Sequence, residues 1–167
     1  MVRGKIHDCD VAQNHHFHYL MPSFQVRTRV NAPMQDVWTL FDATLLAKLS
    51  PPFPKVRIVR FDGCQTGDMV SLELNLLFAK LPWTSQITDS IQNEDVCAFV
   101  DEGVEMPFGL RAWRHEHRIE KQDVTSCTIV DQISFKTNYL LLDYLLFPLF
   151  WGMIVYRIPL YKLYLNL

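Results

Sequence analysis

Two neighbouring segments decide the fold: LRAWRHEHRIE at Leu110–Glu120 and VTSCTIVDQISF at Val124–Phe135. Along the first segment, aromatic and apolar residues alternate with charged ones, as a half-buried strand requires. Its inner face carries Trp113, His115, His117 and Ile119. The short polar stretch Lys121-Gln122-Asp123 lies between the segments. Together they predict a long antiparallel hairpin with one face turned toward the protein interior.

The same period of two continues upstream of this hairpin. It is cleanest at 69–78, where Val70, Leu72, Leu74 and Leu76 alternate with polar residues. We predict further strands at 24–30, 56–62, 69–78, 83–91 and 96–102. Each of these strands has an apolar face, so a sheet of about six to seven strands needs a cover on that side.

Helical spacing occurs in two other places. Asn31-Ala32-Pro33 supplies a cap residue and an early proline, and Met34, Val37 and Phe41 follow on one helix face. A second short helix at 44–49 must end at Ser50-Pro51-Pro52, because consecutive prolines cannot continue a helix. The apolar stretch 139–167 is long enough to cover the sheet. The predicted class is therefore α+β: a curved antiparallel sheet around a long C-terminal helix, with two short helices after strand one.

Length and composition limit the classes of function. The 167 residues predict one domain at 17–167, preceded by a polar lead-in at 1–16. A net charge of −2 gives no field that would attract nucleic acid. Four cysteines without metal-ligand spacing, and an N-terminus without an apolar signal core, predict a cytoplasmic protein with reduced thiols.

The run YLLFPLFWGMIVY at 144–156 carries no charge and raises the question of a membrane span. A spanning helix needs about 20 predominantly apolar residues. Asp143 and Arg157 bracket this run, and Pro148 and Pro159 interrupt the segment around it. A buried or interfacial helix therefore fits better, and weak membrane association or a homodimer contact through this segment stays a hypothesis.

Several local strings resemble the START-like or SRPBCC superfamily, which includes polyketide cyclase/dehydrase-like proteins, START lipid-transfer domains and the Bet v 1 allergens. The strings are Val30-Asn31-Ala32-Pro33 with Val37-Trp38, Gly67-Asp68, Phe99-Val100-Asp101-Glu102 with Pro107-Phe108, and Trp113-Arg114-His115-Glu116-His117. The resemblance implies a helix-grip fold with an internal cavity, in which many members bind lipids, sterols or polyketides. The chain departs from it in two respects: the loop at 63–67 has fewer glycines than that of the plant allergens, and prolines interrupt the closing helix.

A polar group is predicted on the inner face of the long hairpin. If the hairpin turns at Gln122, Trp113 lies opposite Asp131, and Asp131 lies one diagonal step from His115. Three hypotheses compete for this group. It is a satisfied buried network, or His115 or His117 acts as a general acid or base with Asp131 orienting the ring, or the two histidines bind a metal with Asp131, Glu102 or N-terminal residues.

Our leading hypothesis is a non-enzymatic carrier or sensor of a hydrophobic small molecule, with no cofactor and no metal. The rival is a cyclase or dehydratase that uses His115, His117 and Asp131 as catalytic residues. His15, His16 and His18 fit a solvated segment better than a metal site. The predicted ligand-binding residues are Trp113, Trp83, Leu72, Leu74, Ile129, Ile133 and Phe135.

Overall fold

The computed structural model describes residues 21–166 and contains, in that part of the chain, a seven-stranded antiparallel sheet and four helices. The predicted lead-in at 1–16 and His15, His16 and His18 lie outside the described residues. The strands are β1 (Ser23–Val30), β2 (Lys55–Phe61), β3 (Met69–Asn75), β4 (Lys80–Gln92), β5 (Val96–Glu105), β6 (Leu110–Lys121) and β7 (Cys127–Thr137). The helices are α2 (Met34–Thr39), α3 (Ala43–Leu49), α4 (Leu140–Val155) and α5 (Arg157–Leu165).

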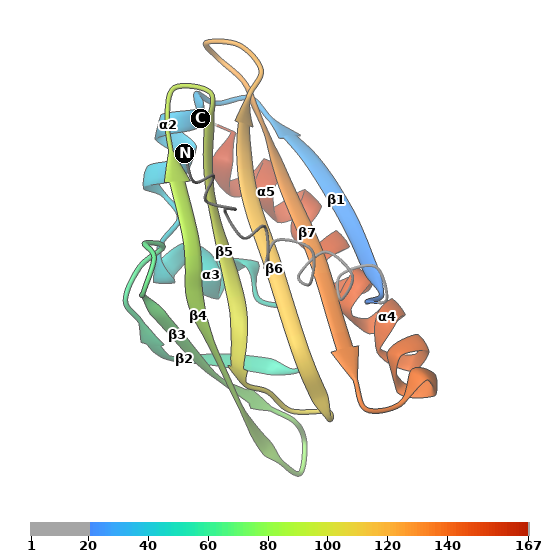
Figure 1. Cartoon of the computed structure of the whole chain (residues 1–167). Helices are drawn as coiled ribbons and strands as arrows, with labels where there is room; N and C mark the ends of the chain where they lie inside the picture. The colour runs from blue at the N-terminus through green and yellow to red at the C-terminus, as the bar shows by residue number, and fades with distance from the viewer. Residues whose placement is uncertain (1–20, 167) are drawn as a thin grey trace, which may run out of the picture.

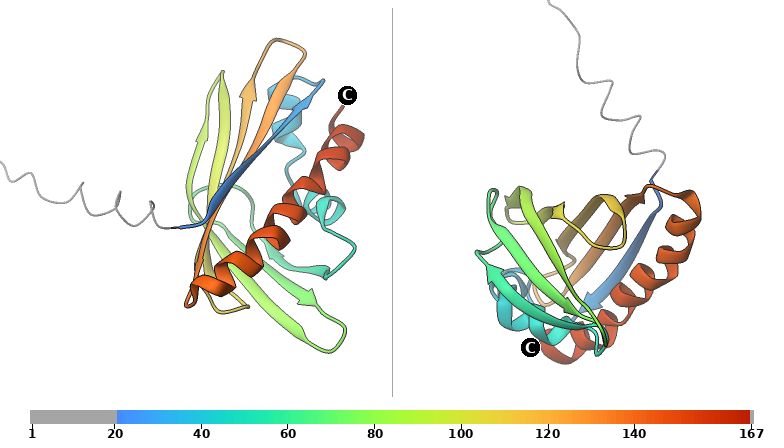
Figure 2. Two further views of the ribbon diagram at one scale, coloured as in Figure 1. Left: turned by 90° about the vertical axis from the view of Figure 1, so that its right-hand side faces the viewer. Right: turned by 90° about the horizontal axis from the view of Figure 1, so that it is seen from below.

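The sheet has the strand order β1-β7-β6-β5-β4-β3-β2. Strands β2 to β7 are therefore joined as consecutive hairpins. The first strand of the chain, β1, pairs with the last one, β7. The sheet is strongly curved, and α4 and α5 cross its concave side (Figure 1, Figure 2). This arrangement confirms the predicted helix-grip architecture, including the two short helices after the first strand.

Local sequence signals explain the short helices. Pro33 precedes α2, and the side chain of Asp42 caps α3 by accepting a hydrogen bond from the backbone N–H of Leu45 at 2.8 Å. Ser50 is extended and ends α3 directly before the prolines. The inward residues of these helices, which include Val37 and Leu45, are buried against the sheet.

The C-terminal segment forms two consecutive helices, with a turn at Tyr156 between α4 and α5. Pro159 explains the position of this break, because its ring lacks an N–H and conflicts with the carbonyl four residues earlier, at Val155. Pro148 lies inside α4 on its exposed side, where the helix accommodates it. The predicted interruption is thus confirmed before Pro159, and α4 and α5 together still cover the sheet.

Three details of the predicted strands are wrong. The strand predicted at 69–78 ends at Asn75, because Leu77 and Phe78 lie in the exposed turn that follows it. The strand predicted from Val124 begins at Cys127, because Val124 is in the turn and its side chain is 79% exposed. The face shared by Trp83, Ile87 and Ile91 does not continue to its end. A register shift between Ile87 and Asp89 reverses the alternation, so Ile91 is 52% exposed.

The core has two apolar clusters with a polar group between them. One cluster includes Ile119 on β6 and Ile129 on β7, and the other includes Trp113 on β6 and Ile133 on β7. The residues that separate these pairs along the two strands are His115, His117 and Asp131, all buried. The fold therefore places ionisable groups at the centre of an apolar interior.

Candidate functional site

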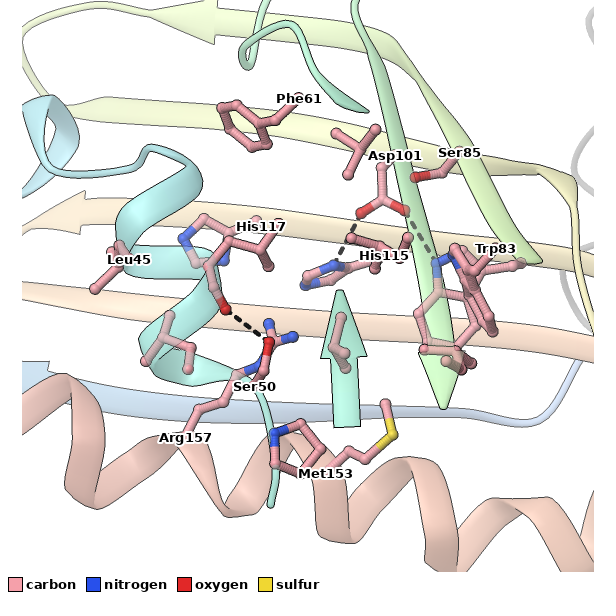
Figure 3. A pocket seen from close by; sticks show the side chains of 18 of the residues that line it. Leu45, Ser50, Phe61, Trp83, Ser85, Asp101, His115, His117, Met153 and Arg157 are labelled. Carbon is pink, nitrogen blue, oxygen red and sulfur yellow. Dashed lines mark hydrogen bonds and ion pairs between the residues drawn. The ribbon is translucent and has the colours of Figure 1, made fainter. Parts of the chain in front are cut away.

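A cavity of about 280 Å³ lies between the concave face of the sheet, α3 with its proline loop, and α4. Most of its wall is apolar, and its polar residues gather on one side. Figure 3 shows that side, where Asp101 and His115 face each other and Arg157 reaches toward them from the C-terminal helix. The apolar wall includes Leu45, Leu49, Val70, Leu72, Leu74, Trp83, Ile87, Phe99, Trp113 and Met153.

The predicted ligand-binding residues separate into two groups. Leu72, Leu74, Trp83 and Trp113 line the cavity. Ile129, Ile133 and Phe135 are completely buried in the packed core and are not among the lining residues. The difference follows from their strand, because β7 lies between β1 and β6 under α4, where side chains fill the space.

The two tryptophans form an aromatic corner of the cavity. Their rings meet edge to face with centroids 4.9 Å apart, and Trp113 contacts Phe150 of α4 at 5.2 Å. Edge-to-face pairs of this kind are a preferred aromatic arrangement and hold the rings in place. A flat apolar ligand would find a rigid surface here.

Trp113, His115 and His117 all point inward from β6, as alternation predicts. The predicted register is wrong: Asp131 lies opposite His117, and Trp113 lies opposite Phe135. The turn is longer than expected, because Asp123 accepts hydrogen bonds from Thr125 and Ser126 and these residues belong to it. In the observed register, Asp131 is again one diagonal step from His115, as predicted, and the two side chains are in contact.

His115 uses both ring nitrogens for contacts with carboxylates. Its Nδ1 lies 3.0 Å from Asp101 Oδ2, and its Nε2 lies 2.9 Å from Asp131 Oδ1. Burial alone would lower the pKa of His115, but the hydrogen bonds and charges of these two carboxylates outweigh burial and raise the pKa to about 9. Because ionised carboxylates only accept, the ring is an imidazolium that donates on both sides.

His117 has the opposite character. Its Nδ1 lies 2.8 Å from Asp131 Oδ1, whereas its Nε2 is buried and has no hydrogen-bond partner in the described part of the chain. Burial lowers its pKa and the attraction of Asp131 does not compensate, so the ring is neutral. Its faces pack against Phe41 and Phe99, at centroid distances of 4.4 and 5.2 Å. The free lone pair of Nε2 is the unusual feature, since buried polar atoms are normally paired.

Sequence reasoning missed three polar members of this wall. Asp101 on β5 accepts from Trp113 Nε1 at 3.0 Å as well as from His115, and Tyr161 of α5 donates to Asp131 Oδ2 at 3.2 Å. Arg157 is the third. An inward-facing aspartate within the apolar strand 96–102 was an available signal for Asp101. No pattern in the sequence indicated which residues of α5 would reach the network.

The metal hypothesis has a partial donor set. Ligand atoms of His115, His117 and Asp131 lie within 4.8 Å of one another. Their distances are those of hydrogen bonds, however, and both rings share the same oxygen of Asp131. Glu102, a predicted additional ligand, lies on the opposite face of β5, where its carboxylate is 3.8 Å from Arg114. A metal at the atoms that share Asp131 would therefore have to displace the hydrogen bonds of both histidines to it.

Comparisons with known proteins show likeness in structure. No family model and no curated protein sequence matches the chain. The Zhui aromatase/cyclase from Streptomyces sp. R1128 is 20% identical with a TM-score of 0.63, over 83% of this chain and 90% of that one. Norcoclaurine synthase from Thalictrum flavum, in complex with dopamine and hydroxybenzaldehyde, is 16% identical with a TM-score of 0.57, over 94% of each chain. A protein from Arthrobacter aurescens is 15% identical with a TM-score of 0.61, over 80% of each chain. The chain thus has the helix-grip fold that its resemblance to the START-like superfamily implied.

Proposed function

We propose that this protein binds a hydrophobic small molecule, of the lipid, polyketide or aromatic type, in its internal cavity. The observation that carries the proposal is a cavity of about 280 Å³ whose wall is apolar apart from one polar side. Native interiors are close-packed, so a space of this size in a small domain calls for a function. The structural neighbours support the proposal, because one is an aromatase/cyclase and another holds dopamine and hydroxybenzaldehyde.

A carrier or sensor fits the state of His115. Both of its ring nitrogens are taken by carboxylates, so it has neither a free lone pair nor a free N–H for a substrate. The network then stabilises the wall of a binding site and takes no part in a reaction. We also propose a cytoplasmic location, which agrees with the three free cysteines among the described residues, Cys64, Cys97 and Cys127.

Titration with the neutral fluorescent probe N-phenyl-1-naphthylamine, followed by native mass spectrometry of the purified protein, tests the proposal. Leu72→Trp places a larger side chain in the cavity wall and is expected to abolish probe binding. Val59→Trp, the same type of change at an exposed position on neighbouring β2, is the matched control and should bind the probe like the unmodified protein. Equal binding by both variants would show that the probe does not use the cavity.

One observation favours a second function, a cyclase or dehydratase. His117 presents a neutral ring whose Nδ1 is held by Asp131 and whose Nε2 lone pair is free, which is the arrangement of an oriented general base. Such a base would take a proton from the carbon next to a ligand carbonyl, and Asp131 would stabilise the resulting imidazolium. With polyketide-type substrates, His117→Ala would abolish turnover in that case, whereas unchanged turnover in both His117→Ala and His115→Ala would exclude this function.

A third function, weak membrane association, is favoured by the outer face of α4. The segment Leu140–Leu165 is long and apolar enough to cross a membrane by length and composition. One side of α4 packs on the sheet through Leu146, Phe150 and Ile154. The opposite side is exposed and carries Tyr139, Leu140, Leu141, Tyr144, Leu145, Leu149 and Trp151.

The position of this outer face connects it with the cavity. Leu149 is exposed and also lines the cavity. Asp143 is buried and Arg157 lines the cavity, so neither bracketing charge interrupts the outer face. The exposed tip of the β3–β4 hairpin, where Leu77 and Phe78 lie, is at the same end of the molecule as the start of α4 (Figure 1, Figure 2). A bilayer surface could therefore deliver an apolar ligand to the cavity.

Co-sedimentation with vesicles of phosphatidylcholine and phosphatidylglycerol tests the membrane contact. The double variant Leu141→Ser, Leu145→Ser should lose vesicle binding, whereas Val59→Ser and Ile91→Ser, at exposed positions on the sheet, should keep it. Full recovery of the unmodified protein in the supernatant would refute membrane association. A dimer that dissociates in the double variant would instead assign the face to a second copy of the chain.

A further inference from the structure

Arg157 is a cation on the cavity wall that forms no ion pair among residues 21–166, and its polar interactions there are with Tyr161 and, through charge, with Asp131 and Asp101. It is the first residue of α5, directly after the break in the C-terminal helix, and its side chain lines the cavity (Figure 3). Its Nε atom is buried and has no hydrogen-bond partner among residues 21–166. No carboxylate of those residues lies within 4.0 Å ion-pairing distance of its guanidinium.

The carboxylates on this wall are occupied by other donors. Asp131 accepts from His115, His117 and Tyr161, and Asp101 accepts from His115 and Trp113. These bonds disperse the negative charge of both aspartates over several donors. Arg157 is half-buried and its guanidinium has no carboxylate partner of this kind, which is costly for a charge on a largely apolar wall. Burial would lower the pKa of Arg157, but Tyr161 and Asp131 raise it, so the group stays charged.

We infer that Arg157 receives a carboxylate of the ligand, and that the ligand class is therefore an apolar, aromatic or acyl, monocarboxylic acid. This inference rests on the proposed function. A guanidinium holds a carboxylate through two parallel N–H···O bonds, which a neutral oxygen cannot form in the same way. The apolar body of the acid would lie against the aromatic corner of Trp83 and Trp113, on the same cavity wall.

The break in the C-terminal helix sets the position of Arg157. Because the turn at Tyr156 separates α4 from α5, the cation sits where the C-terminal segment changes from contacts with the Trp113 cluster to contacts with the Ile119 cluster. Tyr161, one turn further along α5, reaches the network from the same side. The C-terminal segment thus supplies both an apolar lid and the cation.

Calorimetric titration with three matched compounds tests the inference: 2-naphthoate, methyl 2-naphthoate and 2-methylnaphthalene. At neutral pH the unmodified protein is expected to bind the acid at least about tenfold more tightly than the ester, as a charge-assisted hydrogen-bond pair implies. Arg157→Met should remove this preference and leave the affinity for the ester unchanged, which also shows that the cavity is intact. Arg157→Lys should keep part of the preference, because it retains the charge but not the planar fork.

Arg29→Met is the control, since Arg29 is an exposed arginine of β1 that pairs with Asp123 outside the cavity. It should keep the full preference for the acid. Equal affinities for acid and ester in the unmodified protein, or a preference that survives Arg157→Met, would overturn the role of Arg157 while leaving the proposed function in place. Failure of all three compounds to bind would overturn the proposed function and this inference together.

Discussion

At the scale of single residues, Asp131 holds the polar wall together. Its two oxygens accept from His115, His117 and Tyr161, and its own exposed fraction is 1%. Burial would raise the pKa of Asp131, but the hydrogen bonds from both histidines and the charge of His115 lower it well below its usual value. A buried carboxylate that serves three donors cannot be replaced by another residue without leaving donors unpaired.

Asp131→Asn tests this dependence. We expect the free energy of unfolding to fall by about 3–5 kcal/mol, because removing one partner of a buried charged pair leaves the other uncompensated. Urea unfolding followed by circular dichroism measures the change. Asp89→Asn, at an exposed position on β4, is the control and should change stability by less than about 0.5 kcal/mol. A loss as small as that of the control would mean that the network does not stabilise the fold.

His115 makes stability depend on pH in a defined direction. Its native pKa of about 9 lies above the unfolded value of 6.5, so its contribution is fully present below about pH 6.5 and is lost as the pH rises through about 9. At about 1.4 kcal/mol per pH unit, this contribution is on the order of 3 kcal/mol. Urea unfolding at a series of pH values should show the decline, and His115→Asn should flatten it.

His117 provides the comparison for that experiment. Because its native pKa is lowered, it affects stability only below its unfolded value of 6.5, where protonation favours the unfolded chain. His117→Asn should therefore keep the decline between pH 6.5 and 9. If His117→Asn flattens the profile and His115→Asn does not, the assignment of the two rings is reversed.

The sequence predicted which residues of β6 face the polar wall better than it predicted their hydrogen-bond partners. Alternation placed Trp113, His115 and His117 on the inner face because side chains on a strand point to opposite sides in turn. The same alternation could have placed Asp101 on the inner face of its strand, but it could not indicate that Asp101 contacts His115 or that Tyr161 reaches Asp131, since these contacts depend on register and tertiary packing. The roles of the two histidines also follow from these partners, and a strand pattern contains no information on them.

At the scale of elements, the β6–β7 hairpin shows the limit of periodicity. The predicted turn at Gln122 and the observed register differ by an even number of positions, so every side chain stays on its predicted face. The opposing residue changes, and Asp131 faces His117 in place of Trp113. The length of the turn determines which residues lie opposite each other. The hydrogen bonds of Asp123 to Thr125 and Ser126 lengthen the turn, and the strand pattern gives no indication of them.

The start of α4 depends on Asp143. Its carboxylate accepts from the backbone N–H of Thr137 at 2.7 Å and pairs with Lys136 at 2.7 Å, so it ties the helix to the end of β7. We expect Asp143→Ala to lower the free energy of unfolding by about 2–3 kcal/mol, because a buried N–H then loses a charged acceptor. Thermal and urea unfolding measure the loss.

Asp143→Asn is the matched variant for this tether. It keeps an oxygen for Thr137 and loses only the ion pair with Lys136, whose side chain is partly exposed, so it should retain most of the stability. Equal losses in the two variants would show that the ion pair, and not the bond to Thr137, fixes the helix.

At the scale of the whole molecule, the sheet was easier to predict than its cover. Each strand has its own alternation, whereas the C-terminal segment is apolar on nearly all sides and gives no amphipathic signal. Its inner face became identifiable only through packing, with Leu146, Phe150 and Ile154 buried against the sheet. The cavity is likewise a property of the assembled fold, because it depends on how far the helix stands from the curved sheet.

The cavity also sets a trade-off between stability and binding. Its lining residues have no packing partners on the side of the empty space, so a larger side chain that fits there should add contacts. We expect Leu72→Phe to raise the free energy of unfolding by about 0.5–2 kcal/mol, and to weaken the binding of N-phenyl-1-naphthylamine. Urea unfolding and probe titration on the same preparation measure both effects. Val59→Phe, at an exposed position, should change neither. A destabilised Leu72→Phe protein with unchanged probe affinity would mean that the wall at Leu72 is already closely packed, and that ligands occupy the side of the cavity toward Arg157.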